Sequence, residues 1–464
     1  MSAIPSHFIT EIAAIVGASN CTTRREDLHC YSYDGTAKPY LPAVVVFPEN
    51  TGEVSRIMKL ASTYGVPVTP RGAGTGMTGG VVPLQGGVVM PLTRMNRIIE
   101  IDTDNHIAVV EPGVVTGDLQ KAVRHHGFFY PPDPASLKYC TIGGNAAECA
   151  GGPSAVKYGV TKDYIIGLEV VLPSGEIITT GARTEKSVTG YDLNRLFIGS
   201  EGTLGIITRL ILRLLPLPPH KETFLLTSTS LKRATEMVSE ILSASIKPCT
   251  LEYMDKTTIG VVSGFMENPP PKGTEALLIV EIDGEKPIVA EQAERLRALL
   301  EDQPEFTVRQ AGNAREIDEI WQARRAISPS VLKLRPNKIS EDVAVPRSRI
   351  PELVAFTEAL SKELNLLILT FGHAGDGNIH VNIMLDRSVA EEAEHGIMAK
   401  DRLFREAIRL GGTLSGEHGI GFSKAPYMGY ELNEATLSVM KQIKSLFDPK
   451  NILNPGKIFP PSGA

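Results

Sequence analysis

A loop of bare glycines after an apolar segment is the feature that most constrains the fold of this chain. Five of the eleven residues at 70–80, PRGAGTGMTGG, are glycine. Such backbones can approach a pyrophosphate and point successive N–H groups at it. Gly74, Gly76 and Gly79 fit the Rossmann spacing, but that motif needs a helix to open at the last glycine. Residues 81–92, VVPLQGGVVMPL, cannot form one. We therefore predict a phosphate-binding loop without a helix.

Two more glycine clusters follow in the first half of the chain, at 141–152 and 199–205. Three such clusters in one domain suit a long ligand such as a dinucleotide. Glycine is much sparser from 221 to 310, and LPLPP breaks any regular element near Pro216–Pro219. The pattern predicts a nucleotide-binding domain that ends there and a different middle domain, as expected for a chain of 464 residues.

Apolar periodicity predicts interleaved helices and strands, hence a mixed α and β class. Thr51 is expected to cap a helix that ends at Gly65. An antiparallel sheet backed by helices is expected in the middle domain. The predicted strands are 66–70, 87–92, 106–111, 165–172, 177–180 and 275–283, and the predicted helices are 51–65, 231–245, 288–300, 350–364 and 432–447, with a short amphipathic helix at the N-terminus and an extended tail.

Composition excludes several classes of function. The formal charge is −6 and no basic tract is present, so nucleic acid is not an expected partner. The N-terminus lacks the pattern of a secretory signal, and no window has eighteen unbroken apolar residues, so we expect no membrane span and a cytoplasmic protein. The five cysteines are scattered without a CxxC pair, which predicts reduced thiols and no iron–sulfur cluster.

Histidines and acids gather in glycine-framed segments near the C-terminal end. His373 and His380 would face opposite ways on an unbroken strand, but residues 375–377, GDG, supply a turn that can bring them together. Glu417 and His418 lie in SGEHGIG. Two histidines and a carboxylate make a common catalytic zinc set, and equally an iron set. We predict a metal site here rather than ordinary polar loops.

The order of the motifs resembles one known family. RGAGTGMTGG, PPDPAS, TIGGNAAECAGG and IGSEGTLGIIT resemble the FAD domain of the vanillyl-alcohol oxidase and para-cresol methylhydroxylase superfamily. With GHAGDGNIH, SGEHGIG and DPKNILNPGK, nearly the whole chain is similar to the branch of D-lactate dehydrogenases, D-2-hydroxyglutarate dehydrogenases and the flavin subunit of bacterial glycolate oxidase.

The resemblance implies an α+β fold with a two-part FAD-binding domain of the para-cresol methylhydroxylase type and an antiparallel-sheet substrate (cap) domain. The FAD domain is expected at 1–217 and the cap domain, with the metal site, at 218–410. A C-terminal segment at 411–464 is expected to carry the catalytic loop and to return to the FAD domain.

Roles for single residues also follow from the resemblance. Some relatives attach flavin covalently through a histidine where this chain has Thr75, so non-covalent FAD is implied. The pyrophosphate is expected against residues 71–76. The implied FAD-binding residues are Arg71, Gly72, Ala73, Gly74, Thr75, Gly76, Gly79, Pro132, Ser136, Gly143, Gly144, Asn145, Gly151, Gly152, Tyr158, Gly159, Glu201, Gly202, Ile206 and Asn454.

The second half of the chain carries the implied catalytic set. His373, His380 and Glu417 match the metal ligands, with zinc expected first and iron or manganese as alternatives. His418 matches the catalytic base. Arg324, on a helix expected from about Ala314, matches a guanidinium that clamps the substrate carboxylate. Ser328, Lys338 and Asn382 are expected near the acid.

The implied reaction oxidises a small D-2-hydroxy acid to the 2-oxo acid, with D-lactate first and glycolate next. Electrons are expected to leave through an iron–sulfur subunit, an electron-transfer flavoprotein or a quinone, and such a partner could dock the protein at a membrane. The alternatives are a D-2-hydroxyglutarate dehydrogenase, a non-catalytic flavin subunit of an electron-transfer complex, and a metal-dependent hydrolase that merely binds a nucleotide.

Overall fold

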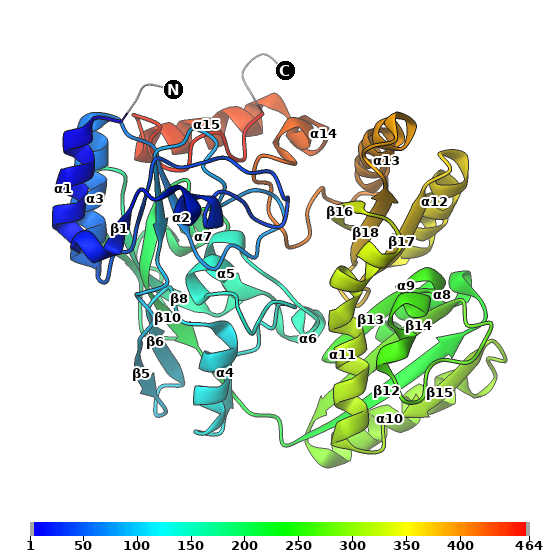
Figure 1. Cartoon of the computed structure of the whole chain (residues 1–464). Helices are drawn as coiled ribbons and strands as arrows, with labels where there is room; N and C mark the ends of the chain where they lie inside the picture. The colour runs from blue at the N-terminus through cyan, green and yellow to red at the C-terminus, as the bar shows by residue number, and fades with distance from the viewer. Residues whose placement is uncertain (1–3, 461–464) are drawn as a thin grey trace. The chain divides into compact units, whose positions relative to one another are not determined.

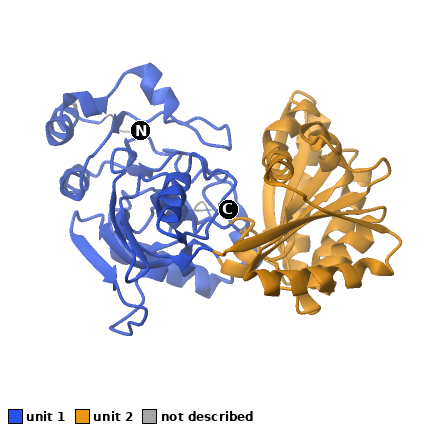
Figure 2. Cartoon of the chain, turned by 90° about the horizontal axis from the view of Figure 1, so that it is seen from below, with its two compact units in different colours: residues 1–151, 160–217, 417–464 blue, residues 152–159, 218–416 orange. Residues whose placement is uncertain are grey.

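A computed structural model describes residues 4–460 and divides the chain into two compact units (Figures 1 and 2). Unit 1 comprises 1–151, 160–217 and 417–464, and unit 2 comprises 152–159 and 218–416. The predicted break after residue 217 coincides with a junction of the units. Residues 152–159 and 411–416 belong to unit 2, although the sequence placed them in the FAD domain and the C-terminal segment. The functional roles of these parts stay predictions.

Unit 1 contains two sheets and a two-stranded pair. In the four-stranded sheet, ordered β1-β2-β4-β3, strands β2, β4 and β3 run parallel. The five-stranded sheet, ordered β5-β6-β10-β8-β9, is antiparallel. The strands are β1 (Cys21–Thr22), β2 (Val44–Val46), β3 (Val68–Arg71), β4 (Val88–Pro91), β5 (Ile98–Asp102), β6 (Ile107–Val110), β7 (Phe128–Phe129), β8 (Ile165–Val171), β9 (Ile177–Gly181), β10 (Ile206–Arg213) and β11 (Leu215–Pro216).

Helices α1 and α3 pack against one another, and their apolar faces share a core with strands β2 to β4. The C-terminal tail rejoins this unit, because Val68 of β3 donates its amide to Ile452 and accepts the amide of Asn454. The helices of unit 1 are α1 (Ser6–Val16), α2 (Arg25–Cys30), α3 (Thr51–Tyr64), α4 (Thr116–Arg124), α5 (Ile142–Glu148), α7 (Asn194–Phe197), α14 (Met428–Glu431) and α15 (Glu434–Phe447). The first three residues of the predicted N-terminal helix lie outside the described range.

The predicted N-cap of α3 is wrong by one residue. The side chain of Asn50 accepts the amide of Glu53 at 3.0 Å, as an N-cap does. The hydroxyl of Thr51 instead donates to Glu169 on β8 at 2.6 Å, so tertiary pairing has taken the group that was expected to cap the helix. Gly65 ends the helix in the left-handed region, as predicted.

Unit 2 is built on one antiparallel sheet of seven strands, ordered β15-β12-β14-β13-β17-β18-β16. Its strands are β12 (His220–Ser228), β13 (Thr250–Asp255), β14 (Ala276–Gly284), β15 (Phe306–Gln310), β16 (Asn337–Ala344), β17 (Leu367–His373) and β18 (Asn378–Leu385). The predicted antiparallel sheet of the middle domain is confirmed.

Apolar side chains from α9 and α11 cover one face of this sheet and include Ile320, Ala323 and Ile327. The other helices of unit 2 that contact the sheet are α6, α8, α10, α12 and α13 (Figure 1). The helices are α6 (Ala155–Tyr158), α8 (Leu231–Ser243), α9 (Lys256–Val262), α10 (Lys286–Glu301), α11 (Ala314–Ser330), α12 (Ile350–Glu363) and α13 (Ala390–Arg409).

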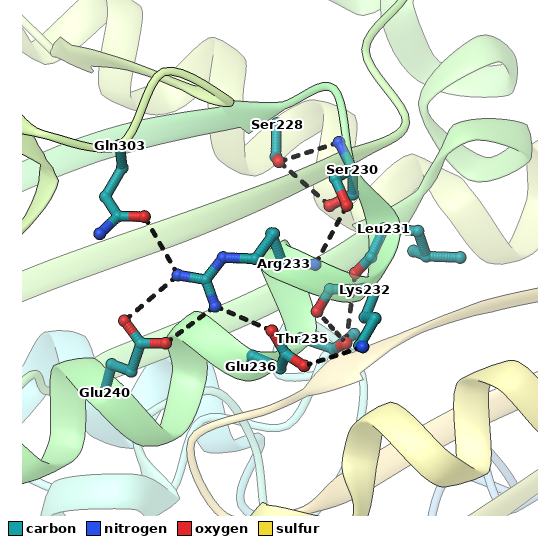
Figure 3. A network of polar contacts seen from close by, with 9 residues as sticks. All are labelled: Ser228, Ser230, Leu231, Lys232, Arg233, Thr235, Glu236, Glu240 and Gln303. Carbon is teal, nitrogen blue, oxygen red and sulfur yellow. Dashed lines mark hydrogen bonds and ion pairs between the residues drawn. The ribbon is translucent and has the colours of Figure 1, made fainter.

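The start of α8 is held by a polar network (Figure 3). Ser230 caps the helix by accepting the amide of Arg233. The guanidinium of Arg233 reaches Glu236 at 2.8 Å, Glu240 at 2.9 Å and Gln303 at 3.1 Å. This network ties the first turns of α8 to the turn after α10 and serves the fold rather than the site. Within residues 4–460, no helix has the length and apolar character needed to cross a membrane.

Candidate functional site

The first glycine loop of unit 1 leaves β3 and runs without a helix to β4, as predicted. Among the described residues, the amides of 73–77 donate no hydrogen bond. Arg71 folds under the loop and donates to the carbonyl of Tyr33 at 2.9 Å. Gly74 has φ +76°, and a Cβ there would lie 2.0 Å from the Arg71 side chain. A row of unpaired amides above a buried guanidinium fits a pyrophosphate.

The second glycine cluster packs directly against this loop. A Cβ on Gly72 would lie 2.5 Å from Thr141 Oγ1, and one on Gly143 would lie 2.4 Å from Pro112 Cβ. The amides of Gly143 and Gly144 already donate, to Pro112 O at 2.8 Å and to Thr141 Oγ1 at 3.3 Å. These two glycines therefore allow close packing, and their amides are not donors for a ligand.

Asn145 and the segment before the cluster are engaged within unit 1. Asn145 donates from its side chain to Thr116 Oγ1 at 2.7 Å. The carbonyl of Pro132 accepts from Gln120 at 3.0 Å, and the carbonyl of Ser136 accepts the amide of Cys140. These residues hold the backbone that leads into α5, beside the first glycine loop.

The third glycine segment contains Glu201, which lies in the left-handed region at φ 52° and is buried. Asn454 stabilises this backbone, since its side-chain amide donates to the carbonyls of Glu201 at 2.7 Å and Gly80 at 2.8 Å. Gly202 lies against Pro70, where a Cβ would stand 2.7 Å from the proline ring. The side chain of Ile206 belongs to the apolar core of the four-stranded sheet.

Residues predicted to bind FAD around 151–159 are divided between the units. Gly151 belongs to unit 1, whereas Gly152, Tyr158 and Gly159 belong to unit 2. The hydroxyl of Tyr158 donates to Asp283 Oδ2 at 2.9 Å within unit 2. The resemblance to the family assigned the whole segment to the FAD domain.

In unit 2, the turn predicted at 375–377 is observed at 374–377, where it closes an antiparallel hairpin between β17 and β18. His380 is paired with Phe371 and His373 with Asn378, so both histidines lie on one face of the sheet. Their ring centroids are 5.1 Å apart, and both side chains are buried. The turn therefore brings together two imidazoles that an unbroken strand would separate.

A buried carboxylate orients the first of these histidines. Glu252 Oε1, on β13, lies 2.5 Å from His373 Nδ1. Burial favours a higher pKa for Glu252, but Arg324 and His373 outweigh it and hold the pKa below its usual value. An ionised carboxylate only accepts, so His373 Nδ1 carries the proton and Nε2 is the nitrogen that can ligate a metal.

Glu417 directly follows Gly416, whose amide donates to Asp342 Oδ2 of β16 at 3.0 Å. His373, His380 and Glu417 each offer one ligand atom, and these atoms lie within 4.8 Å of one another. Zinc binds histidine and carboxylate ligands at about 2.0–2.2 Å, and two histidines with one carboxylate form a familiar catalytic set. The chemistry and spacing of the donors fit a divalent metal.

Helix α11 places three polar side chains over the same sheet face. Trp321 Nε1 donates to Glu281 at 2.9 Å, Arg324 Nε lies 2.5 Å from Glu252, and Ser328 Oγ accepts from Lys338 at 2.7 Å. Glu252 binds both Arg324 and His373. It therefore connects the residue predicted to bind the substrate carboxylate with a predicted metal ligand.

Asn382 and Lys338 lie on this face, near the end of the hairpin. Asn382 is completely buried, and neither its Oδ1 nor its Nδ2 has a hydrogen-bond partner among the described residues. A buried side-chain amide without partners is costly and fits a position that meets a polar ligand. Burial lowers the pKa of Lys338.

His418 stands in a loop of unit 1 that is bonded to the first glycine loop. Its carbonyl accepts from Thr78 Oγ1 at 3.0 Å, and its Nε2 lies 3.8 Å from Glu417 Oε1. The side chain is partly exposed, as a base that meets a substrate must be.

Sequence reasoning missed Glu252, which links the predicted clamp to the predicted metal site. The available signal was a charged residue inside the buried strand segment TLEYMD. A carboxylate is rarely buried unless it is paired, so this position implied cationic neighbours. Its partners lie 72 and 121 residues away and could not be identified from the strand alone.

Comparison with known families defines the class of protein as a flavin-binding oxidoreductase. Residues 217–458 match the family described as FAD linked oxidases, C-terminal domain, and residues 42–181 match the family described as FAD binding domain. The first match spans more than half of the 464 residues. The chain belongs to the FAD-linked oxidases and is an FAD-dependent oxidoreductase.

Named relatives cover almost the whole chain. Glycolate oxidase subunit GlcD of Bacillus subtilis is 43% identical over 97% of this chain and 96% of its own. D-lactate dehydrogenase of Anaerostipes hadrus is 37% identical over 90% and 89%. Glycolate oxidase subunit GlcD of Escherichia coli is 35% identical over 94% and 87%.

Solved structures share the fold at low identity. The 4-ethylphenol oxidase of Gulosibacter chungangensis aligns with a TM-score of 0.80 at 20% identity, over 99% of this chain and 98% of its own. Para-cresol methylhydroxylase aligns with a TM-score of 0.80 at 18% identity, over 97% and 96%. The predicted para-cresol methylhydroxylase type of FAD-binding fold is confirmed.

Proposed function

We propose that this protein oxidises a small D-2-hydroxy acid to the 2-oxo acid with non-covalent FAD and a divalent metal. D-lactate is the first candidate and glycolate the next. The observation that carries the proposal is the linkage of Arg324, Glu252 and His373 beside His380, in a chain of the FAD-linked oxidase family. Relatives named glycolate oxidase subunit and D-lactate dehydrogenase support a hydroxy acid.

Arg324 binds the substrate carboxylate in this proposal. Glu252 occupies its Nε, and its two terminal nitrogens make no hydrogen bond among the described residues. A guanidinium presents such paired donors to a carboxylate in a fixed plane. The pairing with Glu252 holds the fork in place at no cost to these donors. Asn382 supplies a further amide to the bound acid.

His418 takes the proton of the substrate hydroxyl, and His373, His380 and Glu417 hold the metal, zinc in the first instance. When bound, a metal at these ligands would supply Lewis-acid chemistry to the substrate hydroxyl, and FAD would supply the hydride-accepting chemistry. His418 is suited to the base because an imidazole exchanges protons near neutral pH.

Oxidation of D-2-hydroxyglutarate is the second candidate, because Lys338, which the sequence already predicts near the acid, could serve as a second cation. Lys338 lies on the same sheet face as Asn382, and its ammonium group donates only to Ser328 among the described residues. A second carboxylate on the substrate could pair with this ammonium group. When FAD is bound, the electrons that it accepts would pass to a partner protein or quinone, and relatives named as subunits of glycolate oxidase support a partner.

The test is anaerobic bleaching of flavin absorbance by D-lactate, L-lactate, glycolate and D-2-hydroxyglutarate, before and after chelation. We expect one D-acid or glycolate to bleach the flavin rapidly and a chelator to abolish bleaching. Restoration by zinc, iron or manganese identifies the metal. A yellow protein that none of these acids reduces would overturn the substrate class, and bleaching that a chelator leaves unchanged would overturn the metal role.

A further inference from the structure

The backbone of the His418 loop is bonded directly to the first glycine loop. Thr78 Oγ1 donates to the carbonyl of His418 at 3.0 Å. The carbonyl of Thr78 accepts the amides of Phe422 at 3.1 Å and Ser423 at 3.2 Å. Thr78 is buried and lies two residues after the predicted pyrophosphate segment 71–76. Thr78, in the predicted cofactor loop, therefore contacts the His418 loop at residue 418 and again at residues 422 and 423.

Glu201 holds the same loop from a second side. Its two carboxylate oxygens accept the amides of Ile420 and Gly421, each at 2.7 Å. Glu201 is buried and precedes Gly202 in the third glycine segment. Paired charge-assisted hydrogen bonds of this kind are stronger and more directional than neutral ones. Both anchors of the loop thus stand on segments predicted to contact FAD.

Two glycines that follow His418 allow the loop to make close contacts. Gly419 has φ +78°, and a Cβ there would lie 2.1 Å from Glu148 and 3.1 Å from Glu201. Gly421 has φ +53°, and a Cβ there would lie 2.1 Å from the carbonyl of Thr78. Bare backbone at Gly421 therefore lets the loop lie against the carbonyl of Thr78, and bare backbone at Gly419 lets it lie against Glu148 and Glu201.

We propose that Thr78 and Glu201 are positioning residues that fix the backbone of His418 to the two FAD-contacting glycine segments. Cofactor that orders those segments thereby orders the base, and the loop loosens when FAD is removed. This inference rests on the proposed role of His418. Neither residue touches the substrate; each acts through the main chain of the loop.

The first measurement is hydrogen exchange of peptides covering 418–423. We expect faster exchange in the FAD-free protein than in the FAD-bound one. In the FAD-bound protein, Thr78→Val removes the hydroxyl but keeps the shape of the side chain and should speed exchange, whereas Thr78→Ser keeps the hydroxyl and should not. Glu201→Gln, which has one acceptor oxygen instead of two, should speed the exchange of the amides of 420 and 421. Equal exchange in Val and Ser variants would overturn the role of Thr78.

The second measurement is the rate of anaerobic flavin reduction by substrate at equal FAD content. A misplaced base costs about 10- to 100-fold in rate. We expect Thr78→Val and Glu201→Gln to lower this rate with little change in the substrate concentration for half-maximal rate, and Thr78→Ser to restore it. Melting temperature and FAD content show whether each variant is folded.

His418→Ala separates the two proposals. If it reduces flavin as fast as the natural chain, the role of His418 in the proposed function is wrong. If it abolishes reduction while both Thr78→Val and Glu201→Gln reduce flavin at full rate with unchanged exchange, the proposed function stands and the positioning inference fails.

Discussion

Glu252 and Glu281 are two buried carboxylates on the neighbouring strands β13 and β14, and they bind different partners. Glu281 accepts hydrogen bonds from Lys221, Thr223 and Trp321, and none of these partners is a histidine. Glu252 binds Arg324 and His373 instead. Both are paired, as buried charges must be, but of the two only Glu252 contacts a predicted metal ligand.

At this scale we predict that Glu252→Gln weakens metal binding about 10- to 100-fold, the usual effect of losing a carboxylate behind a histidine ligand. Glu281→Gln is the matched control, since it neutralises a buried carboxylate on the same sheet face. Metal affinity measured by competition with a chelator checks this. Equal losses in both variants would show that Glu252 acts on stability alone.

At the scale of elements, the β17–β18 hairpin determines whether the two histidines meet. Its turn depends on Gly377, which has φ +91° and where a Cβ would lie 2.1 Å from the carbonyl of Val345. The amide of Val345 also donates to the carbonyl of Gly377 at 3.0 Å. A side chain at this position must push the turn away from the end of β16.

Gly377→Ala should therefore destabilise unit 2 and reduce metal affinity together, because it moves the strand that carries His380. Gly260→Ala is the control. Gly260 lies in α9 with nothing within 4 Å of an added Cβ, so alanine there should raise helix stability by about 0.5–1 kcal/mol. Urea unfolding and chelator competition on both variants test the pair. Normal metal affinity in a folded Gly377→Ala protein would contradict the role of the turn.

At the scale of the whole molecule, the residues predicted to bind FAD and those predicted to bind the metal fall mainly on different units. The first and third glycine segments belong to unit 1, whereas both histidine ligands and Arg324 belong to unit 2. A ligand stabilises the part that binds it, by about 2.7 kcal/mol when its concentration is 100 times its dissociation constant.

Adding FAD to the cofactor-free protein should thus slow hydrogen exchange first in β3, β4 and α5 of unit 1. Adding zinc to the chelated protein should slow it first in β13, β17 and β18 of unit 2. Peptide-level exchange with each ligand alone measures the two patterns. Zinc protection confined to unit 1 would contradict the predicted ligand set.

Local chemistry was enough to predict much of the chain from its sequence. Glycine and proline exclude a helix after residue 80, a GDG turn reverses the strand between His373 and His380, and Gly65 ends α3. These outcomes depend on the conformations that a few adjacent residues allow, so they are readable in order along the chain. The ordered succession of motifs likewise indicated the family that the comparisons show.

Only the tertiary structure decided which groups those segments meet. The hydroxyl of Thr51, expected to cap α3, donates instead to Glu169, 118 residues away. Glu252 joins Arg324 to His373, and Glu201 binds amides more than two hundred residues away. A charged residue in an apolar strand indicates from the sequence that it needs charged or polar partners. Sheet register and the packing of distant segments determine which residues these partners are, and no local pattern in the sequence relates them.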